Sequence, residues 1–324
     1  MILNVLFTSP GRRVELIEIF RKTFPTNSLF FGADYDNTSP SSFFLDKMFS
    51  VPYKIDEKYV QKVLDISITN KIDMIIPLID TELEIFSLNR ESFKEKGIFI
   101  MVSSPSSIEI ARNKYKTYIY ALNNNIPVPQ TYMPKELNKI DTSFPIIFKP
   151  INGSSSKNIY ICKTLNDLPS KKYFTDEFII QEYIENGIEV TVDIFGTEEG
   201  KCIEAVQRKR LKVRGGEVER GVTIKDPALF KLAELITKTF KPTGVINAQF
   251  VFDYKKEEYK LIEINARFGG GYPLSYKAGA NFPSLLLKMM NGQNLEQNLG
   301  SYDENIYMLR YDNAIYTKEL KNLC

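Results

Sequence analysis

The most informative stretch of the sequence is Ile262-Glu263-Ile264-Asn265-Ala266-Arg267-Phe268-Gly269-Gly270-Gly271. It reads as a strand with alternating polar residues that ends in three glycines. Side chains two positions apart in a strand point to one face, so Glu263 and Asn265 are predicted to lie side by side. Arg267 continues the same face. Alternating polar residues often mark only a solvated strand face, but this pattern is more particular than solvation requires.

A magnesium site is the chemistry that these side chains suit. Gln249, in Asn247-Ala248-Gln249-Phe250, comes from the preceding strand of a predicted hairpin. Its oxygen is therefore expected to converge with those of Glu263 and Asn265. Mg²⁺ takes few protein oxygens and completes its shell with phosphates and water. Arg267 is expected to contact a transferring phosphoryl group.

The composition excludes several mechanisms. The 324 residues include no histidine, which is the usual general base near neutral pH and the commonest zinc ligand. A Ser-His-Asp triad, a Cys-His pair and a His-bearing zinc site are therefore ruled out. The 3 cysteines form no CxxC pair, which favours a reduced, cytoplasmic setting over a disulfide framework.

The charge and hydropathy of the chain give no sign of a polymer or membrane partner. The net charge of +2 provides no global attraction to nucleic acid or to anionic lipid. No segment approaches the ~20 apolar residues of a membrane helix. The short apolar start, Met1–Thr8, is predicted to be a buried strand rather than a signal peptide.

The first hundred residues alternate apolar runs with helical patterns. Strand-helix alternation with fully apolar strands implies βαβ units and a parallel sheet. After a predicted helix over 108–123, the pattern becomes α+β with antiparallel strands. The expected strands are 2–8, 28–34, 73–79, 97–103, 144–150, 158–162, 178–183, 189–196, 205–212, 245–254, 259–264 and 305–317, and the earlier helices are 14–24, 56–69 and 82–96.

Two polar positions follow predicted strands of the first part. Arg12 lies in the turn Ser9-Pro10-Gly11-Arg12-Arg13 before a predicted helix, whose N-terminus attracts anions. An anionic substrate facing Arg12 and a solvated turn explain it equally well, and one glycine is too few for the dinucleotide fingerprint GxGxxG. Asp80 follows the third strand, where ligands gather in parallel sheets. Taken alone, Asp80 is better explained as a cap of the next helix.

Two later loops carry candidates for nucleotide binding. Lys149 stands at the end of a predicted strand, before the loop Ile151–Ser156, which is rich in small and hydroxyl residues. Such a loop can cover phosphates, with the lysine as a point charge, although it is not a Walker A motif. Glu182 and Glu189 flank a turn whose edge can face an adenine and a ribose. Taken alone, a surface loop and solvated hairpin acids explain these patterns better.

The candidates for substrate binding lie in a basic strand. Arg208 and Arg210 share one face and can bind a carboxylate or a phosphate bidentately. A charged edge strand is the alternative. A nucleic-acid patch is disfavoured because the run is short and lacks interleaved aromatic residues. The location between the predicted nucleotide and metal residues favours the active site, and Thr223 is expected to close the same pocket.

As an ordered set, these motifs resemble the ATP-grasp ligases, most closely the branch of the carbamoyl-phosphate synthase large subunit. The resemblance covers residues 1–310. It implies a fold of class α/β plus α+β, in which a Rossmann-like pre-ATP-grasp domain precedes an ATP-grasp fold of two α+β subdomains. The expected domains are 1–110 (pre-ATP-grasp), 111–185 (small lid subdomain) and 186–324 (large subdomain with the metal and substrate site).

The resemblance assigns the cofactor residues one by one. Lys114, in Ala111-Arg112-Asn113-Lys114, matches the first ATP-binding basic position, and Lys149 matches the lysine of the small subdomain. The flexible phosphate loop is matched by Gly153, Ser154, Ser155 and Ser156, the adenine-binding linker by Glu182, Tyr183 and Ile184, the ribose acid by Glu189, the Mg²⁺ ligands by Gln249, Glu263 and Asn265, and the phosphate-contacting arginine by Arg267.

The sequence departs from the family pattern in three places. Many members have aspartate where Gln249 stands, which removes one negative charge and leaves the number of metal ions open. Asn113 stands where aspartate is frequent. Some relatives also carry a histidine near the Arg214–Glu217 turn, and its absence moves the expected substrate from bicarbonate towards an organic acid.

The resemblance implies an ATP-dependent ligase that joins a carboxylate to an amine or another nitrogen nucleophile. The acid is phosphorylated to an acyl-phosphate, with ATP and Mg²⁺ (or Mn²⁺) as cofactors and ADP and phosphate as products. The expected catalytic residues are Lys149, Arg208 and Arg267, and the expected substrate residues are Arg12, Asp80, Arg210 and Thr223. Small molecules are the expected partners, without nucleic acid or membrane, and homodimers are common in this family.

Two other functions stay open. One is synthesis of a small acyl or carbamoyl phosphate as the released product, although carbamoyl-phosphate synthesis uses two ATP-grasp units. The other is a nucleotide-binding regulatory protein without turnover. A dehydrogenase is the most distant alternative.

Overall fold

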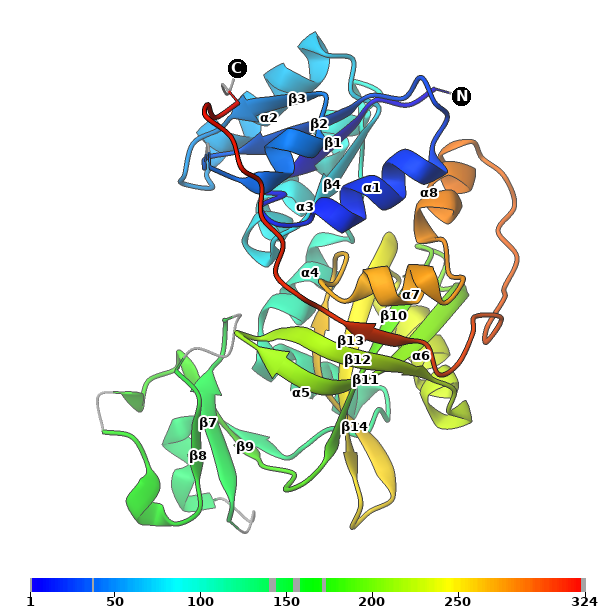
Figure 1. Ribbon diagram of the computed structural model, residues 1–324. Coiled ribbons are helices and arrows are strands. Elements are labelled where there is room, and N and C mark those ends of the chain that lie inside the picture. Colours follow the sequence, from blue (N-terminus) through cyan, green and yellow to red (C-terminus); the bar gives the residue numbers. More distant parts are fainter. Residues whose placement is uncertain (1, 37, 140–143, 154–157, 171–172, 322–324) are drawn as a thin grey trace.

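The computed structural model describes residues 2–36, 38–139, 144–153, 158–170 and 173–321. Three sheets follow one another along this part of the chain (Figure 1). The first is parallel and has five strands, the second has four antiparallel strands, and the third has six antiparallel strands. The predicted class, α/β followed by α+β, is confirmed.

The parallel sheet has the strand order β3-β2-β1-β4-β5. Its strands are buried because they contribute to cores on both faces. Val5 and Phe7 join a core with α1, whereas Leu6 joins a core with α2 and α3. The elements are β1 (Val5–Thr8), α1 (Val14–Thr23), β2 (Phe30–Asp34), the 3-10 helix η1 (Pro40–Phe44), β3 (Lys47–Ser50), α2 (Glu57–Thr69), β4 (Met74–Pro77), α3 (Asp80–Lys94) and β5 (Phe99–Ile100).

The helix predicted over 108–123 is in fact two helices, α4 (Pro105–Arg112) and α5 (Lys114–Asn123). They meet at Asn113, whose φ of −120° and ψ of 111° are not helical. The Asn113 side chain accepts hydrogen bonds from the backbone N–H of Tyr115 and of Lys116, both at 3.0 Å. This N-cap ends one helix and starts the next, which makes Lys114 the first residue of α5.

The four-stranded sheet has the order β6-β9-β7-β8 and a separate small core. Phe148 and Phe178 stack at its centre, with ring centroids 5.1 Å apart. The elements are β6 (Thr131–Tyr132), the 3-10 helix η2 (Pro134–Lys139), β7 (Ile146–Pro150), β8 (Tyr160–Cys162), the 3-10 helix η3 (Leu165–Asp167) and β9 (Phe178–Glu182).

The six-stranded sheet has the order β14-β13-β10-β11-β12-β15. The helix α6 contributes Leu229, Ala233 and Ile236 to the core beneath it. The elements are β10 (Ile188–Gly196), β11 (Cys202–Arg214), β12 (Glu217–Ile224), α6 (Pro227–Phe240), β13 (Gly244–Asp253), β14 (Glu258–Asn265), α7 (Tyr272–Lys277), α8 (Phe282–Met290) and β15 (Tyr307–Leu309).

The strand predicted over 305–317 is only three residues long in the structure, Tyr307–Leu309. Its partner β12 does not extend far enough to pair with the residues that follow. Strand β15 pairs with β12 from Val222 to Arg220, and the N–H of Arg310 then donates to the carbonyl of Glu219. Since β12 starts at Glu217, little backbone remains to pair with. The chain instead runs back to the parallel sheet (Figure 1), where Lys321 donates to the carbonyl of Leu45 at 3.3 Å.

The parallel sheet and the six-stranded sheet share hydrophobic cores. Phe20 of α1 packs edge-to-face on Phe268, with centroids 5.6 Å apart, and Tyr120 of α5 packs on Phe240 of α6 in the same way. The four-stranded sheet has no part in these shared cores among the residues described. No helix in the described ranges is long and apolar enough to cross a membrane.

Candidate active site

A cleft of about 840 Å³ lies between the four-stranded and six-stranded sheets and extends to the end of β4 in the parallel sheet. Almost all of the predicted site residues that the structure describes line it. They are Asp80, Lys114, Lys149, Gly153, Glu182, Tyr183, Ile184, Glu189, Arg208, Arg210, Gln249, Glu263, Asn265 and Arg267. Ser154, Ser155 and Ser156 lie outside the described residues.

The pairing of β13 with β14 brings the predicted metal ligands together. Gln249 pairs with Glu263 across the two strands, and the Asn265 amide donates to Oε1 of Glu263 at 3.0 Å. The Oε1 of Gln249 accepts from Nη1 of Arg210 at 2.9 Å. These residues offer one carboxylate and two amide oxygens. No group of three acidic, cysteine or histidine side chains suited to a metal occurs in the described chain.

This donor set fits Mg²⁺ better than a softer metal. All three ligands are hard oxygens, and Glu263 is the one carboxylate among them. Mg²⁺ is usually held by one or two carboxylates, and substrate phosphates and water supply the remaining oxygens. The residues therefore fit an ion that arrives with a nucleotide.

Lys149 is buried on β7 and faces the metal residues. Its ammonium donates to Oε1 of Gln181 at 2.8 Å, and the Gln181 amide donates to Oγ1 of Thr131 at 2.8 Å. This chain of hydrogen bonds holds the lysine in place without neutralising it. Burial lowers the pKa of Lys149 to about 8, and the nearby charge of Lys114 acts in the same direction.

Lys114 is fixed against the start of the loop after β7. Its backbone N–H donates to the carbonyl of Ile151 at 3.0 Å, and its ammonium donates to the carbonyl of Gly153 at 3.0 Å. The start of α5 is thus tied to the loop that follows β7. An anion bound at this loop would meet a lysine from each of the two elements.

The linker between β9 and β10 is held by a largely buried ion triad. The ammonium of Lys260 contacts both oxygens of Glu182 at 3.0 Å and Oδ2 of Asp253 at 2.9 Å. The Glu182 side chain therefore fixes the linker, and the backbone of 182–184 forms the edge of the cleft. Glu189, at the start of β10, pairs with Arg210 at 2.9 Å.

The far end of the cleft is dominated by arginines. Nη2 of Arg267 donates to Oδ2 of Asp80 at 2.5 Å. Asp80 is the first residue of α3, so this ion pair joins the parallel sheet to the end of β14. Within the described residues, the Nε of Arg267 is buried without a hydrogen-bond partner. A buried donor of this kind is costly unless a ligand accepts from it.

Sequence reasoning did not identify Arg13, Glu217 and Arg310 as a cluster. Glu217 pairs with Arg13 and with Arg310, each at 3.3 Å, and Arg310 also donates to the carbonyl of Gly270. Burial lowers the pKa of Arg13 to about 10. Neighbouring arginines act in the same direction, and Glu217 opposes them. Two cations thus share one carboxylate beside Arg267.

The three glycines after Arg267 allow this crowding. A Cβ on Gly270 would collide with the guanidinium of Arg13, and a Cβ on Gly271 would collide with that of Arg208. Gly269 lies against the amide of Asn247. The glycine run therefore provides the space into which two arginines insert.

Arg208, which was expected to act on substrate, is already paired within the protein. It is 2% exposed and donates to both oxygens of Asp193, at 2.7 and 2.9 Å. Ser275 donates to the same carboxylate at 2.5 Å. The structure places Arg208 at the wall of the cleft as a neutralised pair.

Arg12 and Thr223 are not among the residues that line the cleft. Arg12 is exposed, and its neighbour Arg13 takes the place expected for it. Thr223 is fully buried, donates to the carbonyl of Asp303 at 2.8 Å and accepts from the N–H of Ile306 at 3.0 Å. Its hydroxyl therefore holds the segment before β15. The two neighbouring arginines differ in the direction of their side chains, and the sequence of a turn does not reveal that direction.

The turn that carries Arg13 is fixed by Glu82. The hydroxyls of Thr8 and Ser9 donate to this carboxylate at 2.8 and 2.5 Å, and Tyr59 donates to it as well. Burial raises the pKa of Glu82 to about 7. Ser9 has a left-handed backbone, with a φ of 47°, so these hydrogen bonds stabilise a turn of unusual shape.

Two family models match the chain. Residues 5–101 match the PylC-like N-terminal domain, and residues 174–311 match a family described as ATP-grasp in the biosynthetic pathway with Ter operon. These ranges contain the whole parallel sheet and the whole six-stranded sheet with the predicted metal ligands.

Curated relatives cover most of the chain at low identity. The carbamoyl-phosphate synthase of Methanobrevibacter smithii is 22% identical over 266 residues, which are 76% of this chain and 70% of that protein. The carbamoyl phosphate synthase large chain of Saccharolobus islandicus is 26% identical over 262 residues. That match covers 73% of this chain but only 24% of the relative.

The fold also matches solved structures. The biotin carboxylase domain dimer of the Hydrogenobacter thermophilus 2-oxoglutarate carboxylase, solved with MgADP and bicarbonate, superposes with a TM-score of 0.75. It is 15% identical, and the match covers 95% of this chain and 74% of that one. With the family models and the curated relatives, this fold makes the chain similar to the ATP-grasp ligases, a family whose cofactors are ATP and Mg²⁺, and to its branch with the carbamoyl-phosphate synthase large subunit.

Proposed function

We propose that the protein is an ATP-dependent carboxylate–amine ligase that works through an acyl-phosphate and releases ADP and phosphate. The observation that carries the proposal is one continuous cleft with two different ends. One end holds Lys114, Lys149 and the 182–184 linker, which suit a nucleotide. The other end holds Arg13 and Arg267, which suit a carboxylate. Gln249, Glu263 and Asn265, which would hold the metal ion, line the same cleft.

The first half of the reaction needs position and charge rather than a general base. A carboxylate oxygen of the acid attacks the γ-phosphorus of ATP, and the bond from that phosphorus to the ADP oxygen breaks. Lys149 and Lys114 would bind the phosphates from two sides. Arg267, with its unpartnered Nε, would bind the transferring group or the acid. Gln249, Glu263 and Asn265 would hold Mg²⁺, which supplies charge neutralisation between the phosphates.

The second half forms the new bond. The amine attacks the carbonyl carbon of the acyl-phosphate, the carbon–oxygen bond to phosphate breaks, and the amine proton leaves with phosphate or to solvent. Arg13, Arg310 and Arg210 would retain the acid while this happens. The Gln249 and Glu189 contacts of Arg210 would rearrange when the metal and the ribose are bound.

The test is release of ADP, screened against amino acids, uronic acids and small organic acids, each with small amines. We expect ADP only with the correct acid and Mg²⁺, and trapping with hydroxylamine should give a hydroxamate. Glu263→Gln should lower kcat by about 10²-fold or more, because it removes the one carboxylate ligand. The exposed Glu296→Gln is the matched control and should keep the wild-type rate. AMP as the product, or full activity in Glu263→Gln, would refute the proposal.

Release of a small acyl or carbamoyl phosphate is the second candidate, because the curated relatives are carbamoyl-phosphate synthases. This chain spans only about a quarter of the large chain from Saccharolobus islandicus. The mass of the product separates the two candidates. A homodimer is a further part of the proposal, supported by the dimeric state of the matched biotin carboxylase domain.

A further inference from the structure

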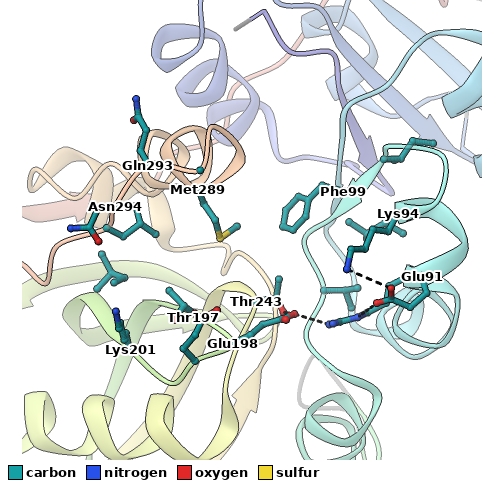
Figure 2. A pocket seen from close by; sticks show the side chains of 18 of the residues that line it. Glu91, Lys94, Phe99, Thr197, Glu198, Lys201, Thr243, Met289, Gln293 and Asn294 are labelled. Atoms are coloured by element: carbon teal, nitrogen blue, oxygen red, sulfur yellow. Dashed lines mark hydrogen bonds and ion pairs between the residues drawn. The ribbon is translucent and has the colours of Figure 1, made fainter.

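A second cavity, of about 600 Å³, lies at the junction of three segments (Figure 2). The segments are the end of α3 with β5, the turn between β10 and β11 with Thr243, and the end of α8 with the loop after it. Of the described residues, none lines both this cavity and the nucleotide cleft. A volume of this size and a position between structural units are typical of small-molecule sites.

The wall of the cavity is tied together across the junction. Glu198, in the β10–β11 turn, accepts from Nη1 of Arg90 at 2.8 Å and from Oγ1 of Thr243 at 2.7 Å. The turn itself is closed by the hydrogen bond from Gly200 N–H to the Thr197 carbonyl at 2.9 Å. The site is therefore already formed, so a ligand would bind without first ordering it.

The remaining charges of the cavity are balanced and loosely held. Arg90 pairs with both Glu198 and Glu91, at 2.8 and 3.4 Å, and the other charged lining residues are Lys94, Lys201 and Glu199. Lys94 and Glu91 lie 3.6 Å apart with side chains that are 76% and 64% exposed, a pair worth little in water. Lys201 forms no direct ion pair within the described chain. A ligand could therefore form ion pairs with these lysines and carboxylates while breaking only weak interactions within the protein.

The floor of the cavity is apolar. Figure 2 shows Phe99 and Met289 facing each other across it, with the two lysines on opposite sides. Methionine adapts its shape to different apolar groups and contacts aromatic rings favourably. The other apolar lining residues are Ile98, Ile100, Val102, Ile203 and Leu295.

We propose that this cavity binds a small zwitterion with an apolar body, of the chemical class of an apolar α-amino acid. Its carboxylate would lie towards Lys201 or Lys94 and its ammonium towards Glu199 or Glu91. Its side chain would lie between Phe99 and Met289. Loosely paired charges of both signs around an apolar floor fit a zwitterion better than a simple anion or a hydrocarbon. The proposal does not depend on the reaction in the nucleotide cleft.

The experiment is calorimetric titration of the full chain with L-leucine and L-phenylalanine. We expect a Kd below about 1 mM. 3-Phenylpropionate, which lacks the ammonium, and phenethylamine, which lacks the carboxylate, should each bind about tenfold more weakly. Binding should persist in the presence of a MgATP analogue, because the two cavities share no residue. Absence of binding by both amino acids, or binding of either analogue as tightly as L-phenylalanine, would overturn the proposal.

Variants locate the binding. Lys201→Glu repels the carboxylate from an exposed position, and Met289→Trp fills the cavity without changing its charge. Each should weaken binding about tenfold or more. Lys231→Ala, on the exposed face of α6, is the control and should bind as wild type. Arg13→Ala should also bind as wild type. Loss of binding in Arg13→Ala but not in Lys201→Glu would place the amino acid in the nucleotide cleft and refute the proposed site.

Discussion

The surroundings of Lys149 lower the pKa of its ammonium group towards neutral pH. Burial lowers its pKa to about 8, well below the ordinary value of 10.5. The charged form, which would bind phosphate, is therefore populated below pH 8 and is lost as the pH rises through 8. Glu263 and Glu189 only partly offset this effect.

We therefore expect kcat/KM to fall above an apparent pKa near 8, because this ratio reports the free enzyme. In the nucleotide complex the phosphates favour the charged lysine, so the alkaline limb of kcat should lie at higher pH. Lys149→Met should lower kcat by about 10²-fold, whereas the exposed Lys163→Met should change neither the rate nor the profile. A profile for wild type that is flat between pH 7 and pH 9 would contradict this role.

Arg12 and Arg13 form a matched pair for a second prediction. Arg13 lines the cleft beside Glu217, and Arg12 is exposed. Arg13→Ala removes one partner of a partly buried charge pair and should lower kcat/KM for the acid about 10²-fold. Arg12→Ala should leave it within about threefold, since isolated surface charges contribute little. Steady-state kinetics with varied acid concentration checks both. The reverse order of effects would restore the role that the sequence suggested for Arg12.

At the scale of elements, the break between α4 and α5 has a functional consequence. A periodic apolar pattern continues through Asn113, so the sequence favours one helix. The Asn113 side chain instead caps α5, and the first residue of that helix, Lys114, donates to the carbonyl of Gly153. The cap is thus both a stabilising feature and a positioning one.

Asn113→Ala should lower the free energy of unfolding by about 1 kcal/mol, the usual effect of losing an N-cap. It should also raise KM for ATP, because Lys114 follows directly in the chain. Asn113→Asp retains the cap oxygens and should restore stability. Urea unfolding and steady-state kinetics measure the two effects. If Asn113→Ala unfolds like wild type, the cap does not stabilise this helix start.

Strands β13 and β14 show which side-chain positions can be predicted from the residue spacing within a strand. The spacing of Glu263, Asn265 and Arg267 predicted a shared face, and the pairing of Gln249 with Glu263 confirms that the hairpin brings these side chains together. A period of two residues in a strand determines side-chain direction, so this part of the site was predictable. Arg208 follows the same rule, but its partner Asp193 comes from β10, and no local pattern points to that contact.

At the scale of the whole molecule, the cleft is formed by parts with different cores. The parallel and six-stranded sheets share hydrophobic clusters, whereas the four-stranded sheet has a small cluster of its own. The linkers around Gln130 and Glu182 join that sheet to the remainder, and Lys260 ties Glu182 to Asp253. The two walls of the cleft therefore belong to units with separate hydrophobic cores, joined by these linkers.

Residue type and local pattern were enough to predict the fold class, the order of the motifs, the exclusion of histidine chemistry and the residues expected around the phosphates. These features depend on local periodicity and on residue type, which the chain displays directly. Only the tertiary structure decided that Arg13 rather than Arg12 faces the cleft and that Thr223 holds the tail. It alone also joined Arg310 and Glu217 to the site. These contacts link segments about 80 to 200 residues apart, and their directions are set by packing between sheets rather than by neighbouring residues.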